Sequence, residues 1–141
     1  MSIGTLAHYS IRTTDLDRSE RFYCEVLGLR AGFRPAFPFP GRWLYIGEDE
    51  SDYGVVHLVG VDEASATALA DYLGSAAGNR GSGTVDHIAF GATGIADMRK
   101  QLEKLGVPYQ ERLVPDLGLR QVFLQDPMGV MLELNYPADE G

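Results

Sequence analysis

The sequence has few cysteines, few histidines and little positive charge. Its 141 residues include one cysteine, Cys24, so an internal disulfide and zinc sites built from several cysteines are excluded. Lys and Arg number 12 against 20 Asp and Glu, a net charge of -8 that argues against a nucleic-acid partner. No apolar run approaches the roughly 18 residues of a membrane span, and no secretory signal opens the chain. We therefore expect a soluble, cytoplasmic protein in which histidines and carboxylates hold any bound metal.

The chain contains an internal repeat. Residues 6–29, LAHYSIRTTDLDRSERFYCEVLGL, and residues 85–107, VDHIAFGATGIADMRKQLEKLGV, each read as a strand with histidine at its third position, a polar break and an amphipathic helix. The apolar helix positions are Leu16, Phe22, Tyr23, Val26 and Leu27 in the first copy and Ile95, Met98, Leu102 and Leu105 in the second.

Capping residues mark the ends of both expected helices. Thr14 or Asp15 in the first copy and Thr93 in the second fit N-caps. Gly28 and Gly106 follow each helix, where a left-handed glycine commonly ends it.

Two or three strands are expected after each helix. Alternating or apolar segments bounded by turn residues lie at 42–47, 53–60, 119–126 and 129–136. Each half is thus a strand, a helix and two or three strands. The first module with a connecting helix-like piece (62–74) spans 1–74, a Gly/Ser-rich linker spans 75–83, and the second module spans 84–141.

All three histidines and one glutamate share an expected face. In the last strand of each half, His57 of VVHL matches Glu133 of MLEL, as His8 matches His87. Period-two alternation places all four opposite the aliphatic positions that pack under the helices, and therefore toward one cleft. A lone strand histidine is more often structural, and Glu133 alone could be a solvated residue. Their joint occurrence predicts a site for a first-row divalent ion.

At these residues the sequence resembles the vicinal oxygen chelate superfamily, which includes glyoxalase I, fosfomycin-resistance and bleomycin-resistance proteins, methylmalonyl-CoA epimerase and extradiol dioxygenases. LAHYSIRTTDLDRSERFYCEVLGL, VDHIAF and FLQDPMGVMLEL carry the resemblance, which covers residues 5–136. It implies an α+β fold of two paired βαβββ modules whose eight strands form a curved, barrel-like mixed sheet around a metal cleft. It also implies that His8, His87 and Glu133 are metal ligands.

The residue at position 57, a histidine here, bears on which reaction such a site could catalyse. The resemblance implies a second carboxylate at this position in glyoxalase I, and this chain lacks it. His57 is therefore either a fourth metal ligand or an unliganded acid–base group of the kind that extradiol dioxygenases use. The position where those dioxygenases carry a catalytic tyrosine is Phe123 here, and Tyr45 in the first half is a candidate substitute.

The remaining candidates would contact substrate. The stretch 34–43, RPAFPFPGRW, is a stiff loop whose Phe37, Phe39 and Trp43 either cover an apolar substrate or pack on one another. Arg120 is a candidate to hold a substrate carboxylate, although a surface arginine is the commoner case. Phe123 would line the same cleft.

Three functions remain open from sequence. An extradiol-dioxygenase-like oxidoreductase with Fe(II), acting on a small substrate through two vicinal oxygens, is narrowly favoured over a glyoxalase-type lyase or isomerase with Zn(II), Mn(II), Ni(II) or Co(II). In the lyase or isomerase, the catalytic base would be Glu133 or His57, which would take a proton next to a carbonyl. A metal-free binding protein of the bleomycin-resistance kind is the third. We expect a homodimer with no membrane partner; the modules could pair within one chain or be exchanged between two.

Overall fold

The computed structural model describes residues 6, 8–50, 54–61, 81, 85 and 87–140. The chain divides into two compact units, Met1–Asn79 and Arg80–Gly141, and each is described by itself. Their boundary falls within the range 75–83. The expected helix-like piece at 62–74, and the expected linker apart from Gly81, lie outside the described residues. In the described part of the chain, no helix is long and apolar enough to cross a bilayer.

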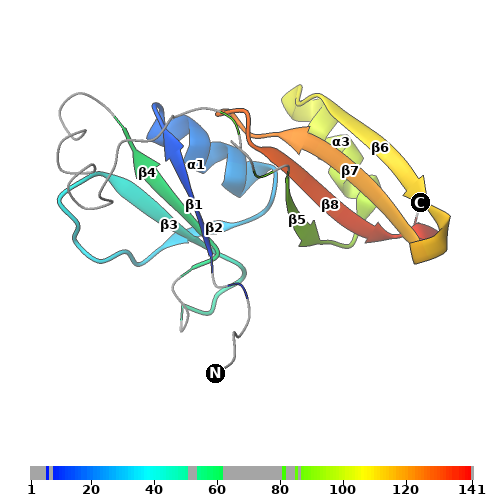
Figure 1. Cartoon of the computed structure of the whole chain (residues 1–141), viewed down its shortest axis with the longest axis horizontal. Helices are drawn as coiled ribbons and strands as arrows, with labels where there is room; N and C mark the ends of the chain where they lie inside the picture. Colours follow the sequence, from blue (N-terminus) through cyan, green and yellow to red (C-terminus); the bar gives the residue numbers. More distant parts are fainter. Residues whose placement is uncertain are drawn as a thin grey trace. The chain divides into compact units, whose positions relative to one another are not determined.

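The first unit is a four-stranded mixed sheet with one described helix (Figure 1). The strand order is β1-β4-β3-β2; β1 runs parallel to β4, and the other neighbours are antiparallel. The elements are β1 (Tyr9–Thr13), α1 (Leu16–Glu25), β2 (Arg30–Gly32), β3 (Gly41–Tyr45) and β4 (Val56–Gly60).

The second unit repeats this topology. Its strand order is β5-β8-β7-β6, with β5 parallel to β8 and the remaining pairs antiparallel. The expected α+β fold of two βαβββ modules is confirmed, and its eight strands form two four-stranded sheets. The elements are β5 (Ile88–Gly91), α3 (Ile95–Leu105), β6 (Tyr109–Val114), η1 (Pro115–Leu117), β7 (Leu119–Gln125), β8 (Met131–Pro137) and η2 (Ala138–Glu140).

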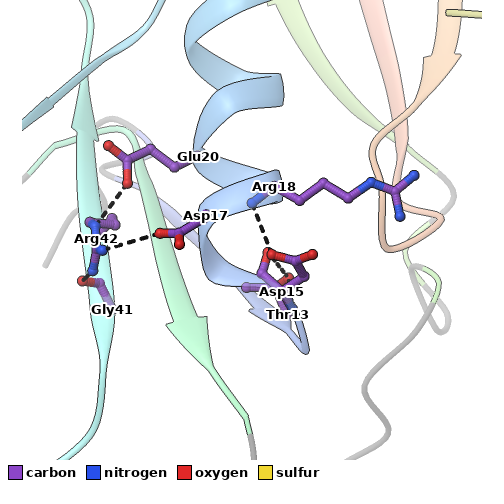
Figure 2. Close-up of polar contacts among 7 residues, drawn as sticks. All are labelled: Thr13, Asp15, Asp17, Arg18, Glu20, Gly41 and Arg42. Carbon is purple, nitrogen blue, oxygen red and sulfur yellow. Dashed lines mark hydrogen bonds and ion pairs between the residues drawn. The ribbon is translucent and has the colours of Figure 1, made fainter.

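Polar contacts cap the N-terminus of α1 and attach the helix to the sheet, as Figure 2 shows. Asp15 is the N-cap, and its Oδ1 accepts a hydrogen bond from Arg18 N at 3.0 Å, which confirms one of the two expected capping residues. On the other side, Arg42 of β3 donates from Nε to Glu20 Oε2 at 2.8 Å and approaches Asp17 at 3.6 Å. Together these contacts attach α1 to β3 at the edge of the helix-covered face.

The helix-covered face of each sheet forms the core. Alternation places Val56 and Leu58 of β4 and Leu132 and Leu134 of β8 on this face, opposite His57 and Glu133, as the sequence predicts. Tyr23 and Val26 of the first helical segment and Ile95 and Leu102 of α3 are buried. The buried aliphatic strand residues on this face are Ile11, Leu44, Val56, Leu58, Val122, Leu124, Leu132 and Leu134.

The ends of α3 show one correction and one confirmation. The N-cap is Gly94, at φ +80°, and not Thr93 as expected. Glycine has no side chain to cap with, so Glu140 of η2 accepts hydrogen bonds from the backbone N–H groups of Gly94 (2.8 Å) and Ile95 (3.3 Å). At the other end, Gly106 is left-handed at φ +67°, as expected.

Candidate metal centre

His57 lies at the centre of a stack of three aromatic rings in the first unit. The His8 ring lies 3.8 Å from it between centroids, at 13° between planes, and the Trp43 ring lies 4.1 Å from it at 8°. Because β4 lies between β1 and β3, the two rings cover opposite faces of the imidazole. His57 is only 8% exposed, and the stack covers the two faces of its ring but not the edge that carries its nitrogens.

Strand register produces this stack. His57 pairs with Ser10 across the parallel β1–β4 ladder and with Trp43 across the antiparallel β3–β4 ladder. His8 lies two residues before Ser10, so alternation directs it to the same face. The expectation that His8 and His57 share a face is therefore confirmed, with both histidines in direct contact. His8 itself immediately precedes β1, so it is not the third residue of the strand as the sequence suggested.

The aromatic loop packs largely on itself. Phe37 stacks on Phe39 at 5.5 Å between centroids and lies 6.2 Å from Trp43. The Arg34 guanidinium lies over both phenylalanine rings, at 4.9 and 5.3 Å, and donates from its NH2 group to the Phe39 carbonyl. Burial lowers the pKa of Arg34, and nearby Arg42 lowers it further. Of the three aromatic residues of this loop that were proposed as substrate contacts, Trp43 is the one that stacks on a predicted site histidine.

The position equivalent to Phe123 in the first unit is Trp43 and not Tyr45. Trp43 pairs with His57 as Phe123 pairs with Glu133, whereas Tyr45 is two residues further along β3. The Tyr45 hydroxyl donates to the Phe33 carbonyl at 2.6 Å, and burial raises the pKa of this tyrosine. The sequence suggested Tyr45 as a catalytic residue. In the structure, its hydroxyl donates a hydrogen bond to a backbone carbonyl.

In the second unit, His87 and Glu133 are in contact. The two side chains meet at 3.0 Å between His87 Nε2 and Glu133 Oε2. Glu133 pairs with Ala89 of β5 and with Phe123 of β7, and His87 lies two residues before Ala89, so all of these side chains share one face. Glu133 is 6% exposed, and the Phe123 ring lies edge-on to His87 at 6.5 Å. Histidine and carboxylate are thus brought together as the sequence predicts.

Gln121 is a further residue at this site that the sequence reasoning missed. Its Nε2 donates to Glu133 Oε1 at 2.7 Å and to Asn135 Oδ1 at 3.0 Å. Its Oε1 accepts from Arg112 Nε and NH2 at 3.1 and 2.6 Å. The signal that could have found it is the alternation in LRQVFLQD, which places Gln121 on the same face as Phe123.

Arg120, predicted to contact substrate, lies on the other face. Arg120 pairs with Tyr136, whereas Phe123 pairs with Glu133. Because Arg120 and Phe123 are an odd number of residues apart on β7, their side chains lie on opposite faces, and Arg120 lies on the helix-covered face. There its NH1 approaches Glu111 Oε2 at 3.7 Å. The arginine on the Glu133 face is Arg112, which pairs with Gln121 and lies over the Phe123 ring at 5.3 Å.

Each unit therefore presents a pair of potential metal ligands. Within either unit, the described residues bring together no three His, Cys, Asp or Glu side chains in a metal-binding group. The donor atoms are imidazole nitrogen and carboxylate oxygen, a set that suits first-row divalent ions. Ligands about 2.1 Å from an ion and at right angles are roughly 3.0 Å apart. The spacing of His87 Nε2 and Glu133 Oε2, 3.0 Å, fits such an arrangement.

Comparisons with known proteins agree with the fold and the repeat. The model of the Glyoxalase/Bleomycin resistance protein/Dioxygenase superfamily matches residues 5–134. A protein named Glyoxylase I 4 from Arabidopsis thaliana is 28% identical over 95% of this chain and 71% of its own length.

Two solved structures share the fold at lower identity. A lactoylglutathione lyase from Agrobacterium tumefaciens matches with a TM-score of 0.63 at 21% identity, over 100% of this chain and 99% of that one. A mutant of the fosfomycin resistance protein FosX from Listeria monocytogenes, in complex with Mn(II) and 1S,2S-dihydroxypropylphosphonic acid, matches with a TM-score of 0.68 at 17% identity. That match covers 96% of this chain and 93% of the other.

Proposed function

Because the chain belongs to the Glyoxalase/Bleomycin resistance protein/Dioxygenase superfamily, we propose that it is an enzyme that uses a divalent metal ion to act on a small substrate with two neighbouring oxygen atoms. The observation that carries the proposal is the contact between His87 Nε2 and Glu133 Oε2, which brings a nitrogen and an oxygen able to bind a metal to 3.0 Å from each other. The FosX mutant in complex with Mn(II) and a vicinal diol is consistent with this class of substrate.

We assign His8, His87 and Glu133 as the metal ligands. Two histidines and one carboxylate leave further coordination positions open, enough for both oxygens of a bidentate substrate. When bound, the ion polarises the substrate carbonyl and makes a neighbouring C–H more acidic.

We assign His57 as the residue that moves the proton. Both oxygens of Glu133 already have partners, Gln121 and His87, so this carboxylate is less available than His57 to take a proton from the substrate. The imidazole of His57 has its faces covered by His8 and Trp43, so its edge nitrogens are held in a fixed direction. A neutral imidazole has one nitrogen that donates and one that accepts, as a group that takes and returns a proton requires.

Proton transfer beside a carbonyl, the chemistry of a glyoxalase-type lyase or isomerase, is the reaction class we favour. The names of two relatives, Glyoxylase I 4 and lactoylglutathione lyase, support it. The flat Trp43 ring next to His57 would contact an apolar part of the substrate.

An extradiol-type dioxygenase is the second candidate. The observation in its favour is the ligand set of two histidines and one carboxylate, which is the set found in Fe(II) oxygenases. Two observations weigh against it: Phe123 has no hydroxyl to donate, and the hydroxyl of Tyr45 is bonded to Phe33.

Activity measurements on the metal-loaded protein separate the two classes. Protein loaded with Ni(II), Co(II), Zn(II) or Mn(II) should isomerise a hemithioacetal formed from a 2-oxoaldehyde and a thiol, without oxygen uptake. His57→Ala should lower kcat by about 10²- to 10⁴-fold while the bound metal is retained. Oxygen consumption with catechols by the Fe(II) form, without isomerase activity, would replace the first candidate by the second.

A further inference from the structure

Gln121 is a buried amide whose hydrogen-bonding groups are all used. It is 7% exposed, its two N–H groups donate to Glu133 and Asn135, and its carbonyl accepts two bonds from Arg112. The direction of the amide is fixed by its neighbours. A guanidinium can only donate and a carboxylate can only accept, so the amide oxygen must face Arg112 and the NH2 group must face Glu133.

The strands hold this arrangement from both sides. Arg112 of β6 pairs with Gln121 of β7, and Gln121 pairs with Asn135 of β8, so the three residues form a row across the sheet. Phe123 and Glu133 form the adjacent row. Gln121 therefore reaches diagonally from one row to the next to hold the carboxylate.

The two carboxylate oxygens of Glu133 therefore have different partners. Oε1 is held by Gln121 at 2.7 Å, and Oε2 faces His87 at 3.0 Å. A carboxylate that is held by one oxygen presents the other oxygen in a fixed direction, and such support of a ligand raises metal affinity. The positive charge of Arg112 on the amide oxygen polarises the amide and strengthens its N–H bond to the carboxylate.

We propose that Gln121 is the positioning residue of the metal-binding carboxylate: it holds Glu133 Oε1 so that Oε2 alone binds the ion, and Arg112 fixes the direction of the Gln121 amide. This inference rests on the proposed function, because it takes Glu133 as a metal ligand.

Titration of the full, untagged chain with Co(II) tests the proposal through affinity and visible absorption, without an activity assay. Gln121→Met keeps the side-chain size and removes the hydrogen bonds. We expect Co(II) binding to weaken by about 10- to 100-fold. The visible band should also change shape, because the freed Glu133 can then bind through both oxygens. Gln125→Met is the matched control; Gln125 is exposed on the same strand and the same face, and its substitution should change neither readout.

Arg112 provides a second, independent variant at an exposed position. Arg112→Met should weaken Co(II) binding several-fold, and Arg112→Lys, which keeps one charged donor, should restore much of it. Loss of a positive charge would by itself tighten the binding of a cation, so weaker binding identifies the lost hydrogen bonds as the cause. If Gln121→Met does not fold, Arg112→Met and Arg112→Lys still test the positioning role of Gln121.

The results separate the two proposals. If the wild-type chain binds no Co(II) at one ion per chain, the proposed function fails. If the wild type binds Co(II), but Gln121→Met and Arg112→Met bind it as tightly as the wild type or more tightly, the positioning role of Gln121 is refuted and the metal site stands.

Discussion

Tyr136 illustrates at the scale of one residue how burial changes chemistry. It is fully buried on the helix-covered face, and its hydroxyl has no hydrogen-bond partner among the described residues. Burial raises the pKa of this phenol to about 12, with a further contribution from the charge of Glu140. An unpaired buried hydroxyl costs about 1–3 kcal/mol, so this group lowers the stability of the fold.

Tyr136→Phe should therefore increase the free energy of unfolding by about 1 kcal/mol at neutral pH. The gain should grow with alkaline pH. The unfolded tyrosine loses its proton near pH 10, whereas the folded one keeps it to about pH 12, so the wild type loses stability between these values. Urea unfolding at pH 7 and pH 11 measures both effects. Tyr109→Phe, which removes an exposed hydroxyl contact to Glu103, is the control for the effect at pH 7. A decrease in stability at both pH values for Tyr136→Phe would contradict the account.

The sequence predicted those site residues whose face of the sheet can be inferred from a single strand. Alternation within VVHL and MLEL sufficed to place His57 and Glu133 opposite their aliphatic neighbours. Alternation in LRQVFLQD places Gln121 on the face of Phe123, but its contacts with Glu133 and Arg112 depend on the register between β6, β7 and β8, which the sequence of one strand does not reveal. Arg120 was misassigned because alternation within β7 was not applied to it: it lies an odd number of residues from Phe123, so its side chain is on the other face.

At the scale of elements, the start of α3 depends on a residue that is distant in sequence. Glu140 caps the N–H groups of Gly94 and Ile95, where the sequence suggested Thr93. The carboxylate also lies at the positive end of the helix dipole.

Glu140→Ala should lower the free energy of unfolding by about 1 kcal/mol, as expected for a lost N-cap. Glu140→Gln should cost less, because its amide oxygen still accepts a hydrogen bond. Thr93→Ala should change stability by less than about 0.5 kcal/mol, because Thr93 does not cap the helix. Denaturant unfolding of the three variants is the measurement. A cost for Thr93→Ala equal to that for Glu140→Ala would show that the cap was misassigned.

Elements with strong periodicity were predicted and short or polar ones were not located. Both helices, and the strands that carry His57, Phe123 and Glu133, follow apolar patterns in the sequence. β2 has only three residues, too few to show alternation. β6 is the edge strand YQERLV, with charged or polar residues on both faces, and so lacks the one-sided pattern of a half-buried strand.

At the scale of the whole molecule, the internal repeat shows which positions of the two units are equivalent. β4 and β8 occupy equivalent places, each between a parallel first strand and an antiparallel third strand. His57 and Glu133 are thus equivalent, as are Trp43 and Phe123. Duplication explains why one face of each unit carries a pair of potential ligands. The expected homodimer, and the choice between pairing within a chain and exchange between chains, stay predictions, because they concern contacts beyond either unit.

The central proposal is that His8, His87 and Glu133, the ligands predicted from the sequence, bind one divalent ion. Elemental analysis of the untagged chain after metal loading and desalting tests it most directly. Wild-type protein and Glu48→Ala, which removes an exposed carboxylate that is not a proposed ligand, should each retain one ion per chain. Glu133→Ala and His8→Ala should retain far less than one while remaining folded by circular dichroism. A wild-type chain without stoichiometric metal, or variants that keep a full ion, would contradict the claim and leave a metal-free binding protein as the better account.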